Sequence, residues 1–181
     1  CIEHCPKQAI GVNGQGQIEI DRDSCDGCMT CVRNCTAMAL QTVAKEMTVE
    51  EVLAKVEQDR GFYDTTGGGM TISGGEMLSQ PEFVRELVDK AAAHGIHVCL
   101  DTSGFGDGDL LEELAAQEIV TTVLYDMKSI DDAIHQKCTG QSNQLILENL
   151  RRLAGHPRIN PKLQMRMPLV HNLNDDWSLI E

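Results

Sequence analysis

The sequence has few aromatic residues, few basic residues and no long apolar run. Aromatic residues make up only 3% of its 181 residues, so its core must be aliphatic. With 15 basic and 28 acidic side chains the net charge is −13, which argues against a surface for nucleic acid or lipid phosphate, because both would repel the chain. No apolar run is long enough to cross a bilayer. We therefore expect a soluble, cytoplasmic protein of one or two domains, with neither nucleic acid nor membrane as a partner.

Cysteine is the one residue type with an unusual distribution. Six of the eight cysteines lie in the first 35 residues, and no secretory signal points to disulfides. Their spacings are those of metal ligands: Cys1, Cys5, Cys25, Cys28, Cys31 and Cys35. Because a ligand-type cysteine stands at position 1 and no start methionine is present, we expect the chain to be a fragment of a longer protein.

The cysteine-rich segment contains an internal repeat. The pattern Cys-x-x-x-Cys-x-x-x-Ala, followed by an aliphatic residue, occurs in residues 1–10 and again in residues 31–40. The second copy completes the spacing C-x-x-C-x-x-C-x-x-x-C, with which bacterial ferredoxins bind [4Fe–4S] clusters: three close thiolates hold one cluster and the fourth reaches another. That rule assigns to one cluster Cys5, Cys25, Cys28 and Cys31. It assigns Cys1 and Cys35 to a second cluster, whose other two cysteines would precede residue 1.

A structural zinc site is the alternative interpretation of these cysteines. C-x-x-C pairs also bind zinc, but zinc needs four ligands in a closed tetrahedron and does not explain why the spacing is duplicated. We therefore predict that residues 1–44 form a ferredoxin-like iron–sulfur domain.

From about residue 45 the sequence alternates between helical and strand patterns. Thr48-x-x-Glu51 is a capping box that opens a helix over roughly 48–60, and Pro81 lies in the first turn of a second helix that stops at Gly95. Further helices are expected at 109–117, 131–138 and 143–154, and apolar strands at 70–72, 96–100, 120–125 and 163–170. Because the crossovers are long, this order predicts an α/β domain over 45–181, with about four parallel strands and helices packed outside them.

Polar, glycine-rich segments directly follow three of these strands. They are Ser73-Gly74-Gly75-Glu76, Asp101-Thr102-Ser103-Gly104 and Asp126-Met127-Lys128, and Arg166 lies in the fourth strand. The carboxyl ends of parallel strands form the ligand-binding edge of such a sheet, so these segments are predicted to form one site. Each segment alone could be only a turn, since Gly-Gly and Ser-Gly favour turns. Their common position after successive strands favours the site.

These segments resemble the glycyl-radical-enzyme activating enzymes, which are radical S-adenosylmethionine (SAM) proteins. The resemblance covers nearly the whole chain, and it also includes Gly67-Gly68-Gly69, the stretch from Thr139 to Leu150, and Arg166-x-Pro168. It is strongest for the subgroup, similar to pyruvate formate-lyase activating enzyme, in which a two-cluster ferredoxin insert precedes the glycine-rich strand. The resemblance implies a partial radical-SAM (β/α) barrel preceded by such an insert.

The resemblance also implies which residues bind SAM. Gly74, Gly75 and Glu76 would hold its amino group, since an ammonium needs acceptors in a fixed arrangement. Lys128 and Arg166 would face its carboxylate. The alternatives are structural: Glu76 could cap the following helix, and Lys128 could be a solvated charge.

A monovalent cation beside the SAM carboxylate is a further implication. Asp101 and Asp126 would hold this cation, with help from Thr102 and the backbone of Leu124, and Ser103 would belong to the same cofactor-binding segment. The alternative is that Asp101 only caps a loop.

One motif of the family is absent from the sequence. Three thiolates of C-x-x-x-C-x-x-C hold the cluster to which SAM binds, and in the family this motif lies upstream of the insert. Cys99 and Cys138 lack the spacing to replace it and are expected to be buried thiols. The last strands of the usual partial barrel are also missing, so we expect an incomplete enzyme that is inactive alone.

The implied activity is reductive cleavage of SAM to methionine and a 5′-deoxyadenosyl radical, which takes a hydrogen atom from a glycine of a partner glycyl radical enzyme under anaerobic conditions. The insert would relay electrons from a donor such as flavodoxin or ferredoxin. One alternative is a dicluster ferredoxin that only carries electrons, against which the segments after residue 45 argue. Another is a radical-SAM maturase of a different peptide, such as a sulfatase, which the segments at Asp126 and Thr139 disfavour.

Overall fold

The computed structural model describes residues 2–176, and the chain divides into two compact units, Cys1–Met47 and Thr48–Glu181. Cys1, one of the predicted cluster ligands, lies outside the described residues. Within residues 2–176, no helix has both the length and the apolar character needed to cross a membrane. We describe each unit by itself and call them the N-terminal unit and the C-terminal unit.

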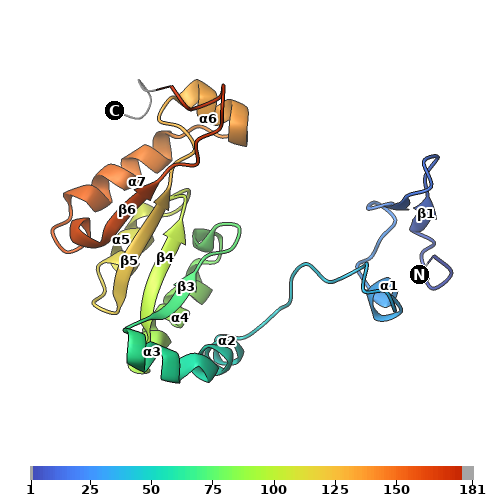
Figure 1. Ribbon diagram of the computed structural model, residues 1–181, viewed down its shortest axis with the longest axis horizontal. Helices are drawn as coiled ribbons and strands as arrows, with labels where there is room; N and C mark the ends of the chain where they lie inside the picture. The colour runs from blue at the N-terminus through green and yellow to red at the C-terminus, as the bar shows by residue number, and fades with distance from the viewer. Residues whose placement is uncertain (1, 177–181) are drawn as a thin grey trace. The chain divides into compact units, whose positions relative to one another are not determined.

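The N-terminal unit is built from a small hairpin and one short helix. Strands β1 (Ile10–Val12) and β2 (Ile18–Ile20) pair antiparallel, and helix α1 (Thr30–Arg33) follows (Figure 1). The hairpin turn is closed by Asn13, whose side-chain oxygen accepts the backbone N–H groups of Gln15 and Gln17 at 3.0 Å each. Among residues 2–47 only Ala9 and Ile10 are buried, so the apolar core of this unit is very small.

The C-terminal unit contains a four-stranded parallel sheet in the order β3-β4-β5-β6, which confirms the predicted α/β architecture (Figure 1). The strands are β3 (Gly69–Ile72), β4 (His97–Thr102), β5 (Val120–Asp126) and β6 (Leu163–Arg166). Helices α2 (Val49–Val56) and α3 (Arg60–Thr66) precede the sheet. The helices that connect or follow its strands are α4 (Pro81–Ala93), α5 (Gly108–Ala115), α6 (Asp132–Thr139) and α7 (Gln144–Gly155). Short 3₁₀ turns lie at Glu57–Asp59, Met77–Ser79 and Asn160–Lys162.

The core of this unit lies between one face of the sheet and helices α4, α5 and α7. Alternate residues of the central strands are fully buried there, for example Leu100 in β4 and Val123 in β5, because successive side chains of a strand point to opposite faces. The other face carries the more accessible residues, among them Asp101 of β4. Apart from Tyr125 the fully buried hydrophobic side chains are aliphatic or methionine, as the shortage of aromatic residues predicts.

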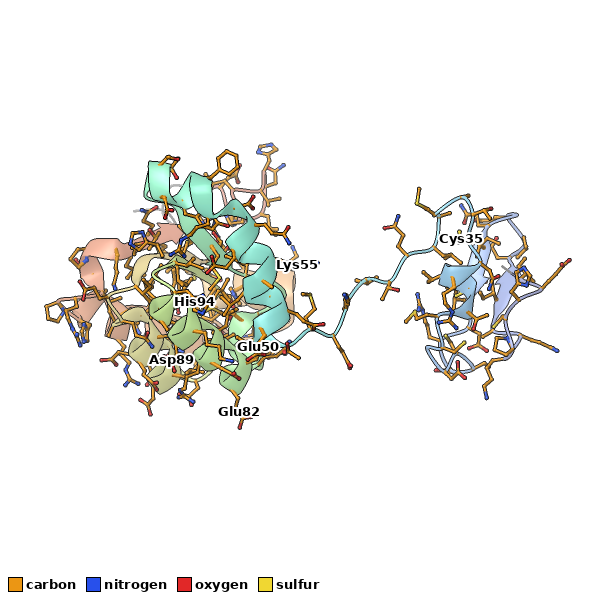
Figure 2. All side chains as sticks on the ribbon, turned by 90° about the horizontal axis from the view of Figure 1, so that it is seen from below. Cys35, Glu50, Lys55, Glu82, Asp89 and His94 are labelled. Carbon is orange, nitrogen blue, oxygen red and sulfur yellow. The ribbon has the colours of Figure 1, made fainter. Side chains whose placement is uncertain are left out.

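Charged residues cover the outside of the helices. Figure 2 shows Glu50 and Lys55 on α2, Glu82 and Asp89 on α4, and His94 directly after α4. One of these outer charges is paired across two helices: Glu50 of α2 contacts Lys90 of α4, which also lies 2.8 Å from Glu86 on its own helix. Packing and surface pairing therefore both join α2 to α4.

Two element boundaries differ from the sequence prediction by more than two residues, and β4 continues to Thr102, so Asp101 and Thr102 lie in the strand rather than after it. The capping box at Thr48 is confirmed, but helical structure does not stop at Gly61. After the turn at Glu57–Asp59, α3 includes Gly61 and ends at Thr66, where Gly67 caps it with a left-handed φ of 68°. Strand β6 ends at Arg166 rather than at residue 170. Pro168 has no N–H to donate, and the N–H of Val170 goes to the side chain of Asn174, so the ladder cannot continue.

The two isolated cysteines also differ in part from expectation. Cys138 is exposed on α6, so the prediction that it is buried is wrong, because it lies on the outer side of that helix. Cys99 is half-buried in β4, and this burial raises the pKa of its thiol.

Candidate functional site

The polar residues predicted from the sequence meet at the carboxyl ends of the four strands. Arg166 Nε donates to Asp126 Oδ1 at 3.0 Å, and the same guanidinium also pairs with Asp101 of β4. Ser73, which follows β3, donates to Asp101 Oδ2 at 3.3 Å, and Lys128 Nζ lies 3.2 Å from Asp126 Oδ2. One network of two cations and two anions therefore connects all four strands.

Arg166 lies at the centre of this network. Its guanidinium contacts both carboxylates between which a monovalent cation was predicted, and it is 42% exposed, so donors remain accessible on its outer side. Thr102, the expected helper of that cation, lies on the opposite face of β4 and donates to Glu76 instead. The network can therefore receive an anionic group through Arg166 and Lys128, while the cation stays a prediction.

The carboxylate of Glu76 is held by four hydrogen bonds. Its Oε1 accepts from Thr102 Oγ1 at 2.6 Å and from Leu78 N at 3.2 Å, and its Oε2 accepts from Ser103 N at 2.9 Å and Ser103 Oγ at 2.5 Å. The bond from Leu78 caps the turn at Met77–Ser79, so the structural role considered for Glu76 is present. The bonds from Thr102 and Ser103 fix a negative charge at the end of β4.

Gly74 and Gly75 have no side chains, so the main chain beside the Glu76 carboxylate is accessible. Gly74 has a φ of 124°, which an L-residue rarely adopts. A Cβ added at Gly74 or Gly75 would meet no atom of the described residues within 4 Å. A ligand can therefore approach the main chain directly at this point.

The N-terminal unit contains a cavity of about 360 Å³. Its lining includes all four cysteines assigned to one cluster: Cys5, Cys25, Cys28 and Cys31. Apolar residues, among them Ile10 and Val32, complete the wall. Within the described part of the chain, no three Cys, His, Asp or Glu side chains converge closely enough to hold a single metal ion. A cubane of four irons and four sulfides is wider than one ion and binds thiolates at its corners, so thiols spread around a cavity are compatible with it, and the [4Fe–4S] cluster stays a prediction.

The two copies of the cysteine repeat have similar local geometry. The backbone N–H of Ala9 donates to Cys5 Sγ, and that of Leu40 donates to Cys35 Sγ, each at 3.3 Å. The bond from Leu40 is the main cause of the lowered pKa of Cys35, which Figure 2 labels. A backbone N–H that donates to the Cys35 sulfur favours its thiolate, which is the form that binds iron.

A set of buried amides near the site was not predicted from the sequence motifs. Asn149 of α7 is 4% exposed and donates to the carbonyl oxygens of Gly104 and Gly106, in the loop after β4. It lies on the same helix face as the buried residues Ile146 and Leu153. An amide on an otherwise apolar helix face is the signal that could have identified it.

The chain is similar both to a family model and to individual curated proteins. The family model of the radical SAM superfamily matches residues 24–180. The chain is 43% identical over 178 residues to the isethionate sulfite-lyase activating enzyme of Nitratidesulfovibrio vulgaris (strain Hildenborough), which covers 97% of this chain and 57% of that protein. It is 35% identical over 182 residues to the (2S)-3-sulfopropanediol dehydratase activating enzyme of Klebsiella oxytoca, covering 100% of this chain and 56% of that protein.

A solved structure is also similar. The crystal structure of a domain of pyruvate-formate lyase-activating enzyme from Bacteroides vulgatus aligns with a TM-score of 0.54 and 32% identity, over 62% of this chain and 67% of that one. The chain therefore spans a little over half the length of the curated relatives that it matches.

Proposed function

The chain belongs to the radical SAM superfamily, and on this premise we propose that it is part of an activating enzyme for a glycyl radical enzyme. The observation that carries the proposal is that one chain holds both a cysteine-lined cavity and a charged network at the carboxyl edge of a parallel sheet. An electron-carrying ferredoxin would need only the first of these. The similarity to proteins named as activating enzymes supports the choice of partner.

We assign the iron–sulfur role to the N-terminal unit. Cys5, Cys25, Cys28 and Cys31 would hold one [4Fe–4S] cluster, and Cys35 would contribute to a second one with Cys1. In radical SAM chemistry an iron–sulfur cluster supplies the single electron that cleaves SAM, and the resulting 5′-deoxyadenosyl radical removes hydrogen from the partner's glycine. The unit would receive electrons from a small redox protein such as flavodoxin or ferredoxin.

We assign SAM binding to the strand ends of the C-terminal unit. Arg166 and Lys128 would donate to the carboxylate of SAM, and because both already pair with Asp126, they are positioned before the ligand arrives. The bare backbone at Gly74 and Gly75, next to the fixed charge of Glu76, would receive the ammonium group. The carboxylate of SAM would thus meet two positive side chains, and its ammonium group would meet the negative Glu76.

The first experiment tests the cluster. Anaerobic reconstitution of the chain with iron and sulfide should give about one [4Fe–4S] cluster, because one set of four ligands is complete. Cys25→Ser should lose most of the bound iron and the electron paramagnetic resonance signal of the reduced cluster. Cys138→Ser, at an exposed cysteine of the other unit, should retain both. Binding of tetrahedral zinc in place of iron and sulfide would contradict the assignment.

The second experiment tests SAM binding by calorimetry on the reconstituted chain. Arg166→Ala should weaken binding by roughly 10-fold to 100-fold, since hydrogen bonds to charged groups are worth about 1.5–3 kcal/mol each. Glu76→Ala should have a similar effect. Arg85→Ala removes the same type of side chain from the outer surface of α4 and should leave the affinity unchanged. Equal affinity of wild type and Arg166→Ala would refute this site.

A further inference from the structure

The loop after β4 accepts two hydrogen bonds from a single buried amide side chain. Asn149 Nδ2 donates to Gly104 O at 2.8 Å and to Gly106 O at 3.1 Å, and Asn149 is only 4% exposed. A Cβ added at Gly108 would lie 2.2 Å from Asn149 Oδ1, so the start of α5 also packs against this side chain. One amide of α7 thus fixes the path of the chain from β4 to α5.

Two further buried asparagine amides hold the loop after β5. Asn143, 1% exposed, donates to the carbonyl oxygens of Ser129 and Ile130 at 3.0 and 2.8 Å, in the loop after β5. Asn174, 3% exposed, donates to Lys128 O at 2.7 Å. Buried amides therefore hold the chain on both sides of the strand-end network, which indicates that these loops are fixed rather than left to adapt to a ligand.

Asn149 is connected to Glu76 through Ser103. Ser103 begins the loop that Asn149 holds, and it supplies two of the four hydrogen bonds on the Glu76 carboxylate. Gly104 is confined on its other side, because a Cβ there would lie 1.7 Å from the hydroxyl of Tyr125. That hydroxyl donates to Ile146 O at 2.6 Å, one turn before Asn149 in α7. The loop is thus clamped between α7 and β5.

We propose that Asn149 is a positioning residue of the ligand site: by holding residues 103–106 it keeps both donors of Ser103 on the carboxylate of Glu76 before any ligand arrives. Without this amide, two carbonyl oxygens lose their buried partner, and the loop must shift toward water to satisfy them. Pre-organisation of this kind lowers the cost of binding, because the loop is not ordered by the ligand. The effect on SAM rests on the proposed function, whereas the effect on Ser103 does not.

The first test measures the loop without a ligand, by amide hydrogen exchange of the full chain. Asn149→Ala should accelerate exchange of the Ser103 amide at least about tenfold relative to that of Met127, which donates to Arg166 O at 2.8 Å. Asn149→Asp, which keeps the shape but removes both donors, should do the same. Leu153→Ala, at a fully buried position of the same helix, should accelerate both amides equally. An unchanged ratio in both Asn149 variants would overturn the proposal.

The second test measures the consequence for the ligand, by calorimetry with SAM. Asn149→Ala should weaken binding about tenfold at a temperature where the variant is folded, and should have no further effect in a Glu76→Ala background, because the two residues act in series. A full tenfold loss in that background would overturn the connection through Glu76. If SAM does not bind the wild type at all, the proposed function fails, while the exchange ratio still decides the positioning role.

Discussion

The two units of the chain are stabilised in different ways. The C-terminal unit has a continuous aliphatic core between its sheet and its helices. The N-terminal unit, in contrast, has two buried residues within 2–47 and a cavity bounded by four cysteines. A segment of this size cannot bury enough apolar surface to be stable alone and usually needs a metal or disulfides. The comparison indicates that the proposed cluster would replace a core in the N-terminal unit, whereas the C-terminal unit would not need it for folding.

The candidate sites of the two units also differ in how their side chains are held in place. In the C-terminal unit the charged and amide side chains hold one another, and residues 2–176 contain no buried side-chain nitrogen or oxygen without a partner. In the N-terminal unit the thiols surround a cavity and Cys28 is exposed. One site is therefore organised by the protein, whereas the other depends on what fills it.

Removing iron should change the stability of the N-terminal unit most of all. When a chelator strips the reconstituted protein, amides of residues 2–47 should lose hydrogen-exchange protection by orders of magnitude, because binding free energy in such units is folding free energy. Amides of β4 and β5 should be unaffected. Equal protection of the N-terminal unit with and without iron would contradict the proposal that a cluster stabilises it.

Truncation of a core side chain in the C-terminal unit should destabilise that unit and leave the N-terminal unit unchanged. Leu100→Ala, at a position that is fully buried in β4, should destabilise the C-terminal unit by about 2–5 kcal/mol. The absorbance of the bound cluster should report an unchanged unfolding midpoint for the N-terminal unit in a urea titration. If both signals shifted together, the units would not be independent.

Alanine variants of two glycines in the C-terminal unit can distinguish the cost of backbone strain from the cost of steric overlap. Gly95 and Gly104 both have positive φ, 64° and 74°, but only Gly104 meets neighbouring atoms at its Cβ position. Both alanine variants should lose stability from the left-handed backbone, by about 1–2 kcal/mol. Gly104→Ala should lose about 1–3 kcal/mol more, because the methyl group overlaps Tyr125. Equal urea midpoints for the two variants would show that the loop after β4 adapts, contrary to a fixed site.

The smallest expected effect concerns the surface of the same unit. Arg85 of α4 donates two hydrogen bonds to Glu113 of α5, at 3.0 and 2.9 Å, and these bonds hold the pKa of Glu113 below its usual range. A lowered folded-state pKa adds stability above the unfolded pKa, and this stability is lost as pH falls through the folded value. Glu113→Gln should therefore be slightly less stable than wild type at neutral pH and equal to it at about pH 2–3. Added salt should reduce the neutral-pH difference, and an increase instead would contradict the ion pair.

Much of the fold follows from local pattern. The capping box at Thr48 and the glycines at the helix ends act through neighbours in sequence, so they could be recognised without a structure. Gly61 was misjudged because a glycine can be tolerated inside a helix that is joined to a neighbour, and here Arg60 of α3 donates to His94 O at the end of α4. The early end of β6 depends on Asn174, which the strand pattern does not contain.

The elements, the order of the strands' polar ends and the spacing of the cysteines could be predicted from residue patterns, because periodicity and spacing are local properties. Which groups meet depends on how the strands and helices pack. Glu76, Ser103 and Asn149 come from three distant segments, and so do Asp101, Asp126 and Arg166. Hydrogen bonds form over about 3 Å, and no pattern along the chain specifies distances of that size between strands and helices that pack later.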